Sequence, residues 1–153
     1  MFHKIIVVCT GNICRSPIAE GLLNQRLQIE NIQVCSAGTA ALAHHPADPN
    51  AVLVAKENGL DISPHRGQQA TQILLTSMDL ILTLDQTHNE WIWSRFPHLR
   101  GRTHKLGRWR NQADIADPYR KPKAAFEQAF SEISMCVDDW ITRIRPALPT
   151  HLP

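Results

Sequence analysis

The residues whose types and spacing could do chemistry lie near the N-terminus, where positions 9–16 read CTGNICRS. Cys9 supplies a thiol, and Arg15, six positions later, supplies a planar guanidinium group that can bind two oxygens of a phosphate. A thiolate is a nucleophile, and a positive environment lowers the pKa of a cysteine. The pattern therefore indicates attack by a cysteine sulfur on the phosphorus of a bound anion.

This loop lies between a predicted strand and a predicted helix. Residues 5–8 are a β-branched run typical of a buried strand, and Gly11 and Asn12 mark the turn that follows. Ser16 is expected to cap the helix, with Pro17 at its first position. A helix N-terminus offers unpaired N–H groups and a partial positive charge, so the loop can hold a dianion and favour a thiolate. The nucleotide P-loop is excluded because its Gly-Lys-Ser/Thr pattern does not occur.

A leaving group departs from phosphorus more easily when an acid protonates it, so the site also needs a carboxyl group. Asp114 and Asp117 are the two carboxyl residues in the basic segment of the chain. Asp117 precedes Pro118 and Tyr119 in a loop that proline stiffens, just before the last predicted helix. Spacing favours Asp117, and Asp114 stays open as the alternative.

Strand and helix patterns alternate along the rest of the chain. The predicted elements are strands at 32–35, 79–84 and, more weakly, 104–106, and helices at 49–59, 86–96 and 122–144. Asp48 and Asp85 are expected to cap two of these helices, and Gly59, Pro97 and Pro146 to end them. The alternation predicts a parallel sheet covered by helices on both faces, with the site beyond the carboxyl ends of the strands.

Length and composition exclude several classes of protein. The chain has 153 residues, 43% hydrophobic and 20% charged, a balance typical of a single globular domain over residues 1–153. No apolar run approaches the ~18 residues of a membrane span, and the N-terminal run is too short for a signal peptide. Four cysteines and eight histidines show neither a disulfide-scaffold nor a metal-site spacing. We therefore expect a cytoplasmic protein with reduced thiols, no metal, no cofactor and no insertion into the membrane.

The net charge of +2 conceals an uneven distribution of charge. Residues 95–123 hold nine lysines and arginines against two acids, a local charge of +7, so the remainder carries seven bases against twelve acids, or −5. Two interpretations of this basic segment stay open. It is either a solvated, arginine-rich surface or a rim that attracts a negatively charged substrate.

The loop and the acid together resemble the low-molecular-weight protein tyrosine phosphatase family, and the resemblance covers nearly the whole chain. The matching stretches are VCTGNICRSP at 8–17, DPY at 117–119, SAG at 36–38, DP at 48–49 and DLIL at 79–82. LGRW at 106–109 and DPYRK at 117–121 resemble the bacterial subgroup that serves capsule and exopolysaccharide export. The family fold is a single-domain, four-stranded parallel sheet with helices on both faces, in agreement with the predicted elements.

The resemblance implies roles for the reacting residues. Cys9 would be the nucleophile that forms a phosphocysteine, Arg15 would bind phosphate and stabilise the transition state, and Asp117 would act as general acid and then as general base. No metal would be required. Phosphate oxygens would be bound by the backbone of Thr10, Gly11, Asn12, Ile13, Cys14, Arg15 and Ser16.

The resemblance also implies a supporting set around the loop. Ser16 would stabilise the thiolate, and Asn12, held by Ser36, would shape the loop. Tyr119 would line the pocket and stack on a phenyl ring. The chain departs from the family pattern where large aromatic residues are expected, and Leu42 is the apolar residue expected to wall the pocket instead.

Among the three remaining cysteines, Cys14 is the one for which a redox role is considered. Cys14 resembles the neighbouring loop cysteine with which the family can trap the nucleophile in a reversible disulfide, and the alternative is that Cys14 only packs behind the loop. Cys35 and Cys136 fall at predicted core positions of a strand and a helix and are expected to be inert.

These observations favour a cytoplasmic phosphatase that acts on phosphotyrosine in proteins. The expected partner is an autophosphorylated, membrane-anchored bacterial tyrosine kinase that controls capsule or exopolysaccharide production, and no nucleic acid is expected. A thiol-dependent arsenate reductase shares the anion loop but needs a relay cysteine pair, and positions 79–98 contain no cysteine. The third hypothesis is a non-catalytic module that binds phosphate or nucleic acid through the basic segment.

Overall fold

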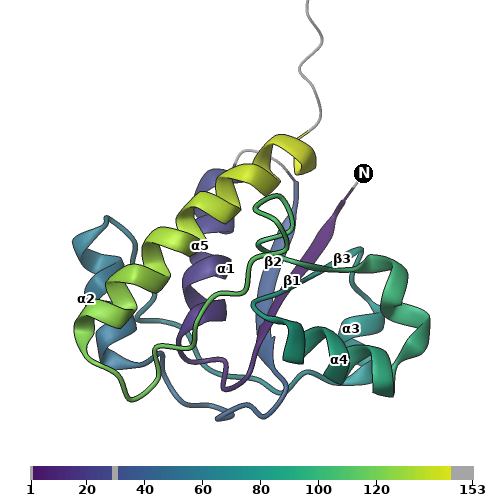
Figure 1. The fold of residues 1–153 in the computed structure, drawn as a ribbon, viewed down its shortest axis with the longest axis horizontal. Helices are drawn as coiled ribbons and strands as arrows, with labels where there is room; N and C mark the ends of the chain where they lie inside the picture. The colour runs from purple at the N-terminus through teal and green to yellow at the C-terminus, as the bar shows by residue number, and fades with distance from the viewer. Residues whose placement is uncertain (1, 29–30, 146–153) are drawn as a thin grey trace, which may run out of the picture.

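A four-stranded parallel sheet forms the centre of the protein in the computed structural model, which describes residues 2–28 and 31–145 (Figure 1). The strands lie in the order β2-β1-β3-β4, and each neighbouring pair is parallel. Their bounds are β1 Lys4–Cys9, β2 Gln33–Gly38, β3 Leu80–Thr83 and β4 Thr103–Lys105. Because the strands are parallel, their carboxyl ends meet at one edge of the sheet, where α/β proteins bind ligands.

Helices cover both faces of this sheet, so the predicted fold class is confirmed. α1, α2 and α5 pack on one face, and α3, α4 and a 3-10 helix pack on the other (Figure 1). Their bounds are α1 Arg15–Arg26, α2 Pro49–Glu57, α3 Gln72–Thr76, α4 Gln86–Arg95, the 3-10 helix Pro97–Arg102 and α5 Lys123–Ile144. Within the described ranges, no helix has the length and hydropathy needed to cross a membrane.

The alternation of side chains along β1 directs Cys9 toward α1. Ile5, Val7 and Cys9 belong to the hydrophobic cluster beneath α1, α2 and α5. Ile6 and Val8 belong to the second cluster, beneath α3 and α4. Cys9 is the last residue of the strand and pairs with Gly38. Its thiol therefore lies at the carboxyl edge of the sheet, on the face that carries the N-terminus of α1.

The apolar stripe of α5 packs into the larger cluster. Ile141 is partly buried at its edge, and the other six residues of the predicted stripe are buried. The six are Phe126, Phe130, Ile133, Val137, Trp140 and Ile144. The predicted end of this helix at Pro146 lies outside the described residues.

The helix boundaries agree with the sequence at two N-termini and differ at a third. Asp48 caps α2 and Asp85 caps α4, each accepting a hydrogen bond of 2.9 Å from a backbone N–H of the first turn. The prediction that Ser16 caps α1 is wrong, because the helix begins at Arg15 with Cys14 at the cap position. The Ser16 hydroxyl forms its hydrogen bonds inside the preceding loop instead.

Two short elements were not predicted from the sequence. α3 and the 3-10 helix have five and six residues, and so short a segment carries little hydrophobic periodicity. Gly59 ends α2 with a φ of 77°, the left-handed conformation that the sequence predicts for it. Cys136 is buried as expected, but Cys35 is only partly buried because β2 is an edge strand.

Candidate active site

The loop between β1 and α1, residues 9–16, is held from outside by its carbonyl groups; we call it the phosphate loop. Five consecutive carbonyl oxygens accept hydrogen bonds of 2.7–3.0 Å from surrounding segments. The pairs are Thr39 N to Cys9 O, Ala40 N to Thr10 O, Leu42 N to Gly11 O, His65 Nε2 to Asn12 O and Asp48 N to Ile13 O.

This arrangement turns the N–H groups of the phosphate loop inward. A trans peptide directs the carbonyl of one residue and the N–H of the next to opposite sides, and the described chain contains no cis peptide. Among the described residues, no acceptor is found for the N–H groups of positions 11–14. These donors and the N-terminus of α1 therefore face the same space, which suits a dianion.

The Cys9 thiol is hydrogen-bonded to Ser16, with 2.8 Å between Sγ and Oγ. Asn12 Nδ2 donates to Ser16 Oγ at 2.7 Å and to Ser36 Oγ at 2.9 Å. The orientation of the Asn12 amide is fixed because its Oδ1 accepts from Gln68 N at 2.9 Å. Ser16 therefore accepts from Asn12 and keeps its own proton for the Cys9 sulfur, which stabilises a thiolate.

Arg15 is almost completely buried, with 2% of its side chain exposed, and its guanidinium group is fixed from behind. Nη1 donates to Asp85 Oδ2 and to Ile115 O, both at 2.7 Å. Burial opposes ionisation of Asp85, but hydrogen bonds from Thr87 and Arg15 prevail and lower its pKa to about 2. Asp85 is therefore a carboxylate at neutral pH, and Arg15 is held in one orientation by an ion pair.

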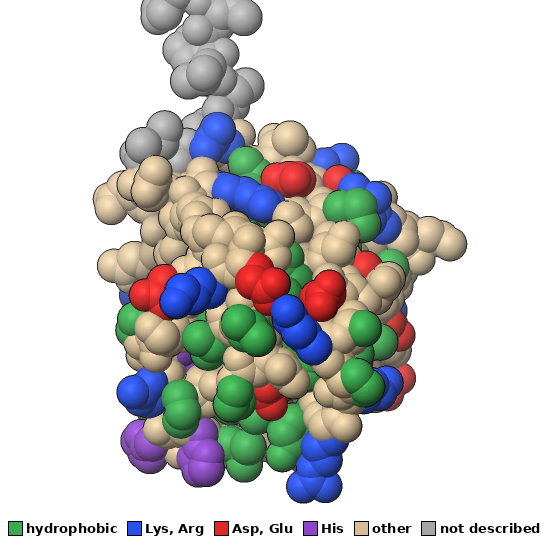
Figure 2. All heavy atoms as spheres, turned by 90° about the vertical axis from the view of Figure 1, so that its left-hand side faces the viewer, with side chains coloured by type: hydrophobic (Ala, Val, Ile, Leu, Met, Phe, Trp, Pro, Cys, Tyr) green, Lys and Arg blue, Asp and Glu red, His purple; other side chains and the backbone are tan. Residues whose placement is uncertain are grey.

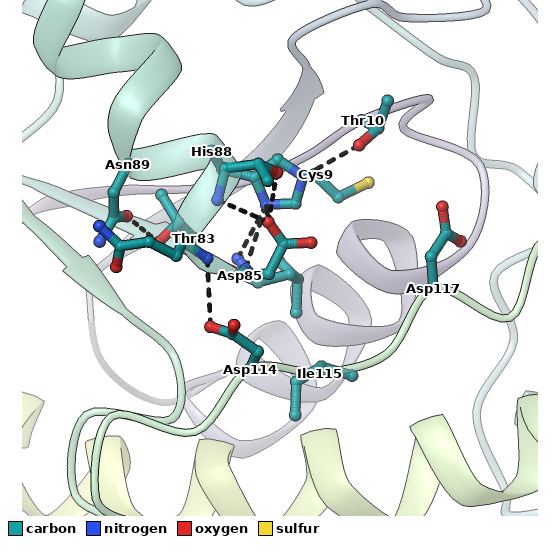
Figure 3. A network of polar contacts seen from close by, with 12 residues as sticks. Cys9, Thr10, Thr83, Asp85, His88, Asn89, Asp114, Ile115 and Asp117 are labelled. Atoms are coloured by element: carbon teal, nitrogen blue, oxygen red, sulfur yellow. Dashed lines mark hydrogen bonds and ion pairs between the residues drawn. The ribbon is translucent and has the colours of Figure 1, made fainter.

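The geometry distinguishes the two candidate acids. Asp114 Oδ1 accepts from Lys105 Nζ at 2.8 Å and from Gln86 N at 3.1 Å, which directs it away from the phosphate loop (Figure 3). Asp117 lines the pocket, and its Oδ2 lies 3.7 Å from Arg15 Nη2. Its side chain is 47% exposed and so can exchange protons with solvent. The geometry favours Asp117 as the proton donor.

A pocket of about 190 Å³ opens above the phosphate loop. Leu42 and Tyr119 form its apolar edge, and Cys9, Arg15 and Asp117 reach it from different elements. Its lining residues are Cys9, Thr10, Gly11, Ile13, Cys14, Arg15, Ala40, Leu42, Asp117 and Tyr119. Since a cavity of about 150 Å³ accepts benzene, the pocket is large enough for a phenyl ring.

Ser36 lies beneath the loop and holds Asn12, as the resemblance implies.

The sequence did not predict the part that the first turn of α4 takes in this site. Asp85 was predicted as a helix cap, and it also binds Arg15. The sequence predicts no role for His88, and its Nε2 lies 3.0 Å from the Thr10 hydroxyl oxygen. Burial lowers the pKa of His88 to about 4, so its ring is neutral at neutral pH. The cap signal at Asp85 placed this turn near a helix start but did not reveal its contacts with the loop.

The cysteines differ in their environments. Cys9 and Cys14 both line the pocket and are free thiols. Burial raises the pKa of Cys14 far above its usual value, and the charges of Asp48 and Cys9 add to the effect. Burial also raises the pKa values of Cys35 and Cys136, each to about 11. Among the described residues, no group of three or more His, Cys, Asp and Glu side chains is arranged to hold a metal ion.

The basic segment, residues 95–123, reaches the pocket through Asp117 and Tyr119 rather than through its positive charges. None of its lysines and arginines is among the described residues that line the pocket. Three form ion pairs and four stack on aromatic rings. The pairs are Lys105–Asp114, Arg110–Asp139, Lys123–Glu57, Arg95–Trp91, Arg100–Trp93, Arg108–Trp109 and Arg120–Tyr119. This favours the interpretation as a partnered, arginine-rich surface over that of an anion-attracting rim.

A thiol at the end of a parallel strand, inward-facing N–H groups, a fixed guanidinium and a nearby carboxyl define a class of protein, the cysteine-dependent phosphatases. Comparisons with known proteins identify the family within this class. The sequence profile of the family described as low molecular weight phosphotyrosine protein phosphatase matches residues 4–148. The chain belongs to this family, and it is an enzyme of the protein-tyrosine-phosphatase type, as the sequence predicts.

Individual relatives support this assignment. The probable low molecular weight protein-tyrosine-phosphatase EpsP of Ralstonia nicotianae is 50% identical over 145 residues, covering 95% of this chain and 98% of the relative. The structure of Vibrio vulnificus Wzb in complex with benzylphosphonate is 43% identical, with a TM-score of 0.89 and coverage of 94% and 99%. The YwlE arginine phosphatase from Geobacillus stearothermophilus is 30% identical, with a TM-score of 0.89 and coverage of 99% and 98%.

Proposed function

We propose that the protein hydrolyses phosphotyrosine through a phosphocysteine on Cys9. The observation that carries the proposal is that Cys9, Arg15 and Asp117 line one pocket above the inward-facing N–H groups of the phosphate loop. The Cys9 sulfur attacks phosphorus, and the bond from phosphorus to the phenolic oxygen breaks as Asp117 gives that oxygen a proton. Arg15 and the backbone N–H groups bind the other phosphoryl oxygens as charge develops on them.

The second half of the reaction returns the enzyme to its starting state. Asp117, now a carboxylate, takes a proton from a water molecule, and the water oxygen attacks the phosphorus of the phosphocysteine. The sulfur–phosphorus bond breaks, inorganic phosphate is released, and Cys9 leaves as a thiolate. The hydrogen bond from Ser16 stabilises that thiolate as the leaving group.

The apolar edge of the pocket supports an aromatic phosphate ester as substrate. Leu42 and Tyr119 are 39% and 41% exposed, so they offer apolar surface that a phenyl ring would cover. The benzylphosphonate bound by the Vibrio vulnificus relative carries such a ring. A phosphoarginine substrate, suggested by the arginine phosphatase relative, would need a carboxylate for its guanidinium group. Asp117 is the one carboxyl among the described lining residues, and proton transfer already employs it.

The proposed partner is the phosphotyrosine-bearing tail of an autophosphorylated, membrane-anchored bacterial tyrosine kinase. The enzyme would act on this tail in the cytoplasm and so control capsule or exopolysaccharide production. The sequence similarity to the capsule-associated subgroup supports this proposal, together with the similarity to EpsP of Ralstonia nicotianae and to Wzb of Vibrio vulnificus.

Three variants test the mechanism. Cys9→Ser is expected to lose turnover of para-nitrophenyl phosphate and of a phosphotyrosine peptide. Asp117→Asn is expected to lose about 10²–10⁴-fold in kcat/KM, which reports formation of the phosphocysteine, with phenyl phosphate, whose leaving group needs a proton, and much less with para-nitrophenyl phosphate. Asp114→Asn is the matched control and should stay within a few-fold of the wild type.

Other results would contradict the roles proposed for Cys9 and Asp117. Retained turnover in Cys9→Ser would disprove the nucleophile. Equal losses of kcat/KM on both esters in Asp117→Asn, or a leaving-group-dependent loss of kcat/KM in Asp114→Asn, would remove Asp117 from the role of acid. A comparison of phosphotyrosine, phosphoserine and phosphoarginine peptides tests the substrate class, because faster hydrolysis of either of the last two would contradict it.

A further inference from the structure

The first turn of α4 contacts the phosphate loop at a second point, which the mechanism above does not use. His88 Nε2 lies 3.0 Å from Thr10 Oγ1 (Figure 3). Thr10 follows Cys9 directly and lines the pocket, whereas His88 is 1% exposed. The contact therefore joins a buried ring to a residue that faces the substrate.

The other nitrogen of the ring determines which group donates. His88 Nδ1 accepts hydrogen bonds from Leu84 N at 3.3 Å and from Asp85 N at 3.2 Å. A neutral imidazole carries one proton, and that proton must be on Nε2 because Nδ1 is an acceptor. Nε2–H therefore donates to Thr10 Oγ1. The Asp85 carboxylate lies 3.6 Å from Nδ1, but this contact is not an ion pair because Nδ1 carries no proton.

The Thr10 hydroxyl thus accepts a hydrogen bond on its buried side and keeps its own proton. We propose that this hydroxyl donates a hydrogen bond to the phosphoryl group of the substrate, and that His88 is the positioning residue that fixes it in this role. The inference rests on the proposed phosphatase function. It adds a side-chain donor to the backbone N–H groups of the loop and makes position 10 a determinant of phosphate affinity.

The same turn of α4 then positions two donors for one anion. Asp85 orients the Arg15 guanidinium through a hydrogen bond of 2.7 Å, and His88 orients the Thr10 hydroxyl. The two contacts begin three residues apart on one helical turn and end at the second and seventh residues of the phosphate loop. A shift of this turn would therefore move both donors together.

Paired variants at position 10 test the donor itself. Thr10→Ser keeps the hydroxyl group, whereas Thr10→Val keeps the shape of the side chain and loses the hydroxyl group. Calorimetric titration with inorganic phosphate measures affinity without turnover. Thr10→Val is expected to bind phosphate about tenfold more weakly, which is the effect of one hydrogen bond to a charged group, with a similar fall in kcat/KM for para-nitrophenyl phosphate. Thr10→Ser should stay within about twofold of the wild type. Equal affinities for the two variants would overturn the proposal.

His88→Asn tests the positioning role. The asparagine Oδ1 lies where Nδ1 does, so it still accepts from the backbone N–H groups, but no atom replaces Nε2. We expect His88→Asn to bind phosphate as weakly as Thr10→Val does. The double variant His88→Asn/Thr10→Val should show no additional loss of affinity. Wild-type affinity in His88→Asn, or additive losses in the double variant, would show that His88 does not act through Thr10.

Two further measurements are needed. One distinguishes a loss of phosphate binding from a loss of folding, and the other distinguishes failure of this proposal from failure of the proposed function. The unfolding midpoint of each variant distinguishes a general loss of structure from a loss of phosphate binding, and the Thr10 pair decides the first part of the proposal even where His88→Asn does not fold. Retained turnover in Cys9→Ser would disprove the proposed function. The phosphate titrations would still report on Thr10, so the two failures are distinguishable.

Discussion

Hydrogen bonds beyond Asn12 help to determine that Ser16 donates, and Cys9 accepts, in the hydrogen bond between them. Ser36 Oγ donates to Glu20 Oε1 at 2.9 Å, so it is free to accept from Asn12 Nδ2. The same amide nitrogen then donates to Ser16, whose proton is left for the sulfur. The Glu20 carboxyl group, three hydrogen bonds from Ser16, therefore helps to orient the donor that stabilises the nucleophile. Asn12 has a φ of 58°, a left-handed conformation that asparagine tolerates, and it places the amide at this junction.

Cys14 allows a prediction about recovery from oxidation. Hydrogen peroxide would convert the Cys9 thiolate to a sulfenic acid, and the Cys14 sulfur would displace water from it to form a disulfide. We expect wild-type activity to return on treatment with dithiothreitol, whereas Cys14→Ser should lose activity irreversibly as the sulfenic acid oxidises further. Because the pKa of Cys14 is raised, disulfide formation should accelerate with rising pH.

The measurement is residual para-nitrophenyl phosphate turnover after timed exposure to peroxide and then reduction. Cys35→Ser is a matched control, since Cys35 is absent from the pocket lining. Equal recovery of Cys14→Ser and wild type would assign Cys14 to packing behind the loop.

At the residue scale, a local sequence pattern was enough to predict which side chains lie together. The nine residues from Cys9 to Pro17 contain the thiol, the guanidinium and the turn, and the structure places all three around one pocket. Asp85 and His88 could not be predicted in the same way. Their partners, Arg15 and Thr10, are 70 and 78 positions away, and only the pairing of β1 with β3 brings them together.

At the scale of elements, the end of β2 supports the phosphate loop through Gly38. A Cβ atom at this position would lie 2.4 Å from the Thr10 carbonyl oxygen, which is a backbone atom. Gly38→Ala is therefore expected to displace the loop, lowering the free energy of unfolding by about 1–3 kcal/mol. We expect kcat to fall by at least about tenfold because the inward-facing N–H groups move with the carbonyl.

Gly101→Ala is the matched control for this prediction. A Cβ atom there meets nothing within 4 Å, so stability should change by no more than about 0.5 kcal/mol. Urea denaturation and para-nitrophenyl phosphate kinetics of the two variants check it. Wild-type kinetics in Gly38→Ala would show that the loop adapts without loss of function.

The neutral His88 ring at the start of α4 makes stability depend on pH. Its pKa is lowered by burial from the usual 6.5 to about 4, so the folded state favours the neutral ring. The resulting stabilisation is complete above pH 6.5 and is lost as the pH falls toward 4. Between pH 7 and pH 5, the wild type should lose roughly 2 kcal/mol more of its free energy of unfolding than His88→Asn does. Urea denaturation at the two pH values measures this difference, and parallel pH profiles would contradict it.

The order of elements was predictable because each long element carries its own periodicity and end signals. The apolar stripe of α5 runs from Phe126 to Ile144 within a helix of 22 residues, and Asp48 and Asp85 mark helix starts by accepting hydrogen bonds from N–H groups of the first turn. The start of α1 was predicted wrongly because serine is a residue type that commonly caps helices, whereas the Ser16 hydroxyl is hydrogen-bonded to the Cys9 thiol. A tertiary contact overrode the local signal at the functional site.

At the scale of the whole molecule, the charge distribution favours one of the two interpretations that the sequence left open, an arginine-rich surface. The local charge of +7 in residues 95–123 is distributed over α4, the 3-10 helix, the loops around β4 and the start of α5. The face seen in Figure 2 likewise shows basic and acidic side chains interspersed. Exposed charges farther apart than about 8–10 Å are largely screened at physiological ionic strength. The protein should therefore recognise its substrate by short-range contacts at the pocket more than by its overall field.

Arg120 is the basic residue for which a direct effect on an acidic substrate is expected. Its guanidinium lies 5.2 Å from the ring of Tyr119, which lines the pocket. For a phosphotyrosine peptide with acidic flanks, raising the salt concentration from about 20 mM to about 300 mM should lower kcat/KM by no more than about threefold. The effect is small because few basic side chains lie close enough to the bound peptide for salt to screen their interaction with it. Arg120→Ala should remove most of that salt dependence, whereas Arg100→Ala, which removes a guanidinium stacked on Trp93, should leave it intact. A tenfold or larger salt effect that persists in Arg120→Ala would instead show that the distant bases steer the substrate.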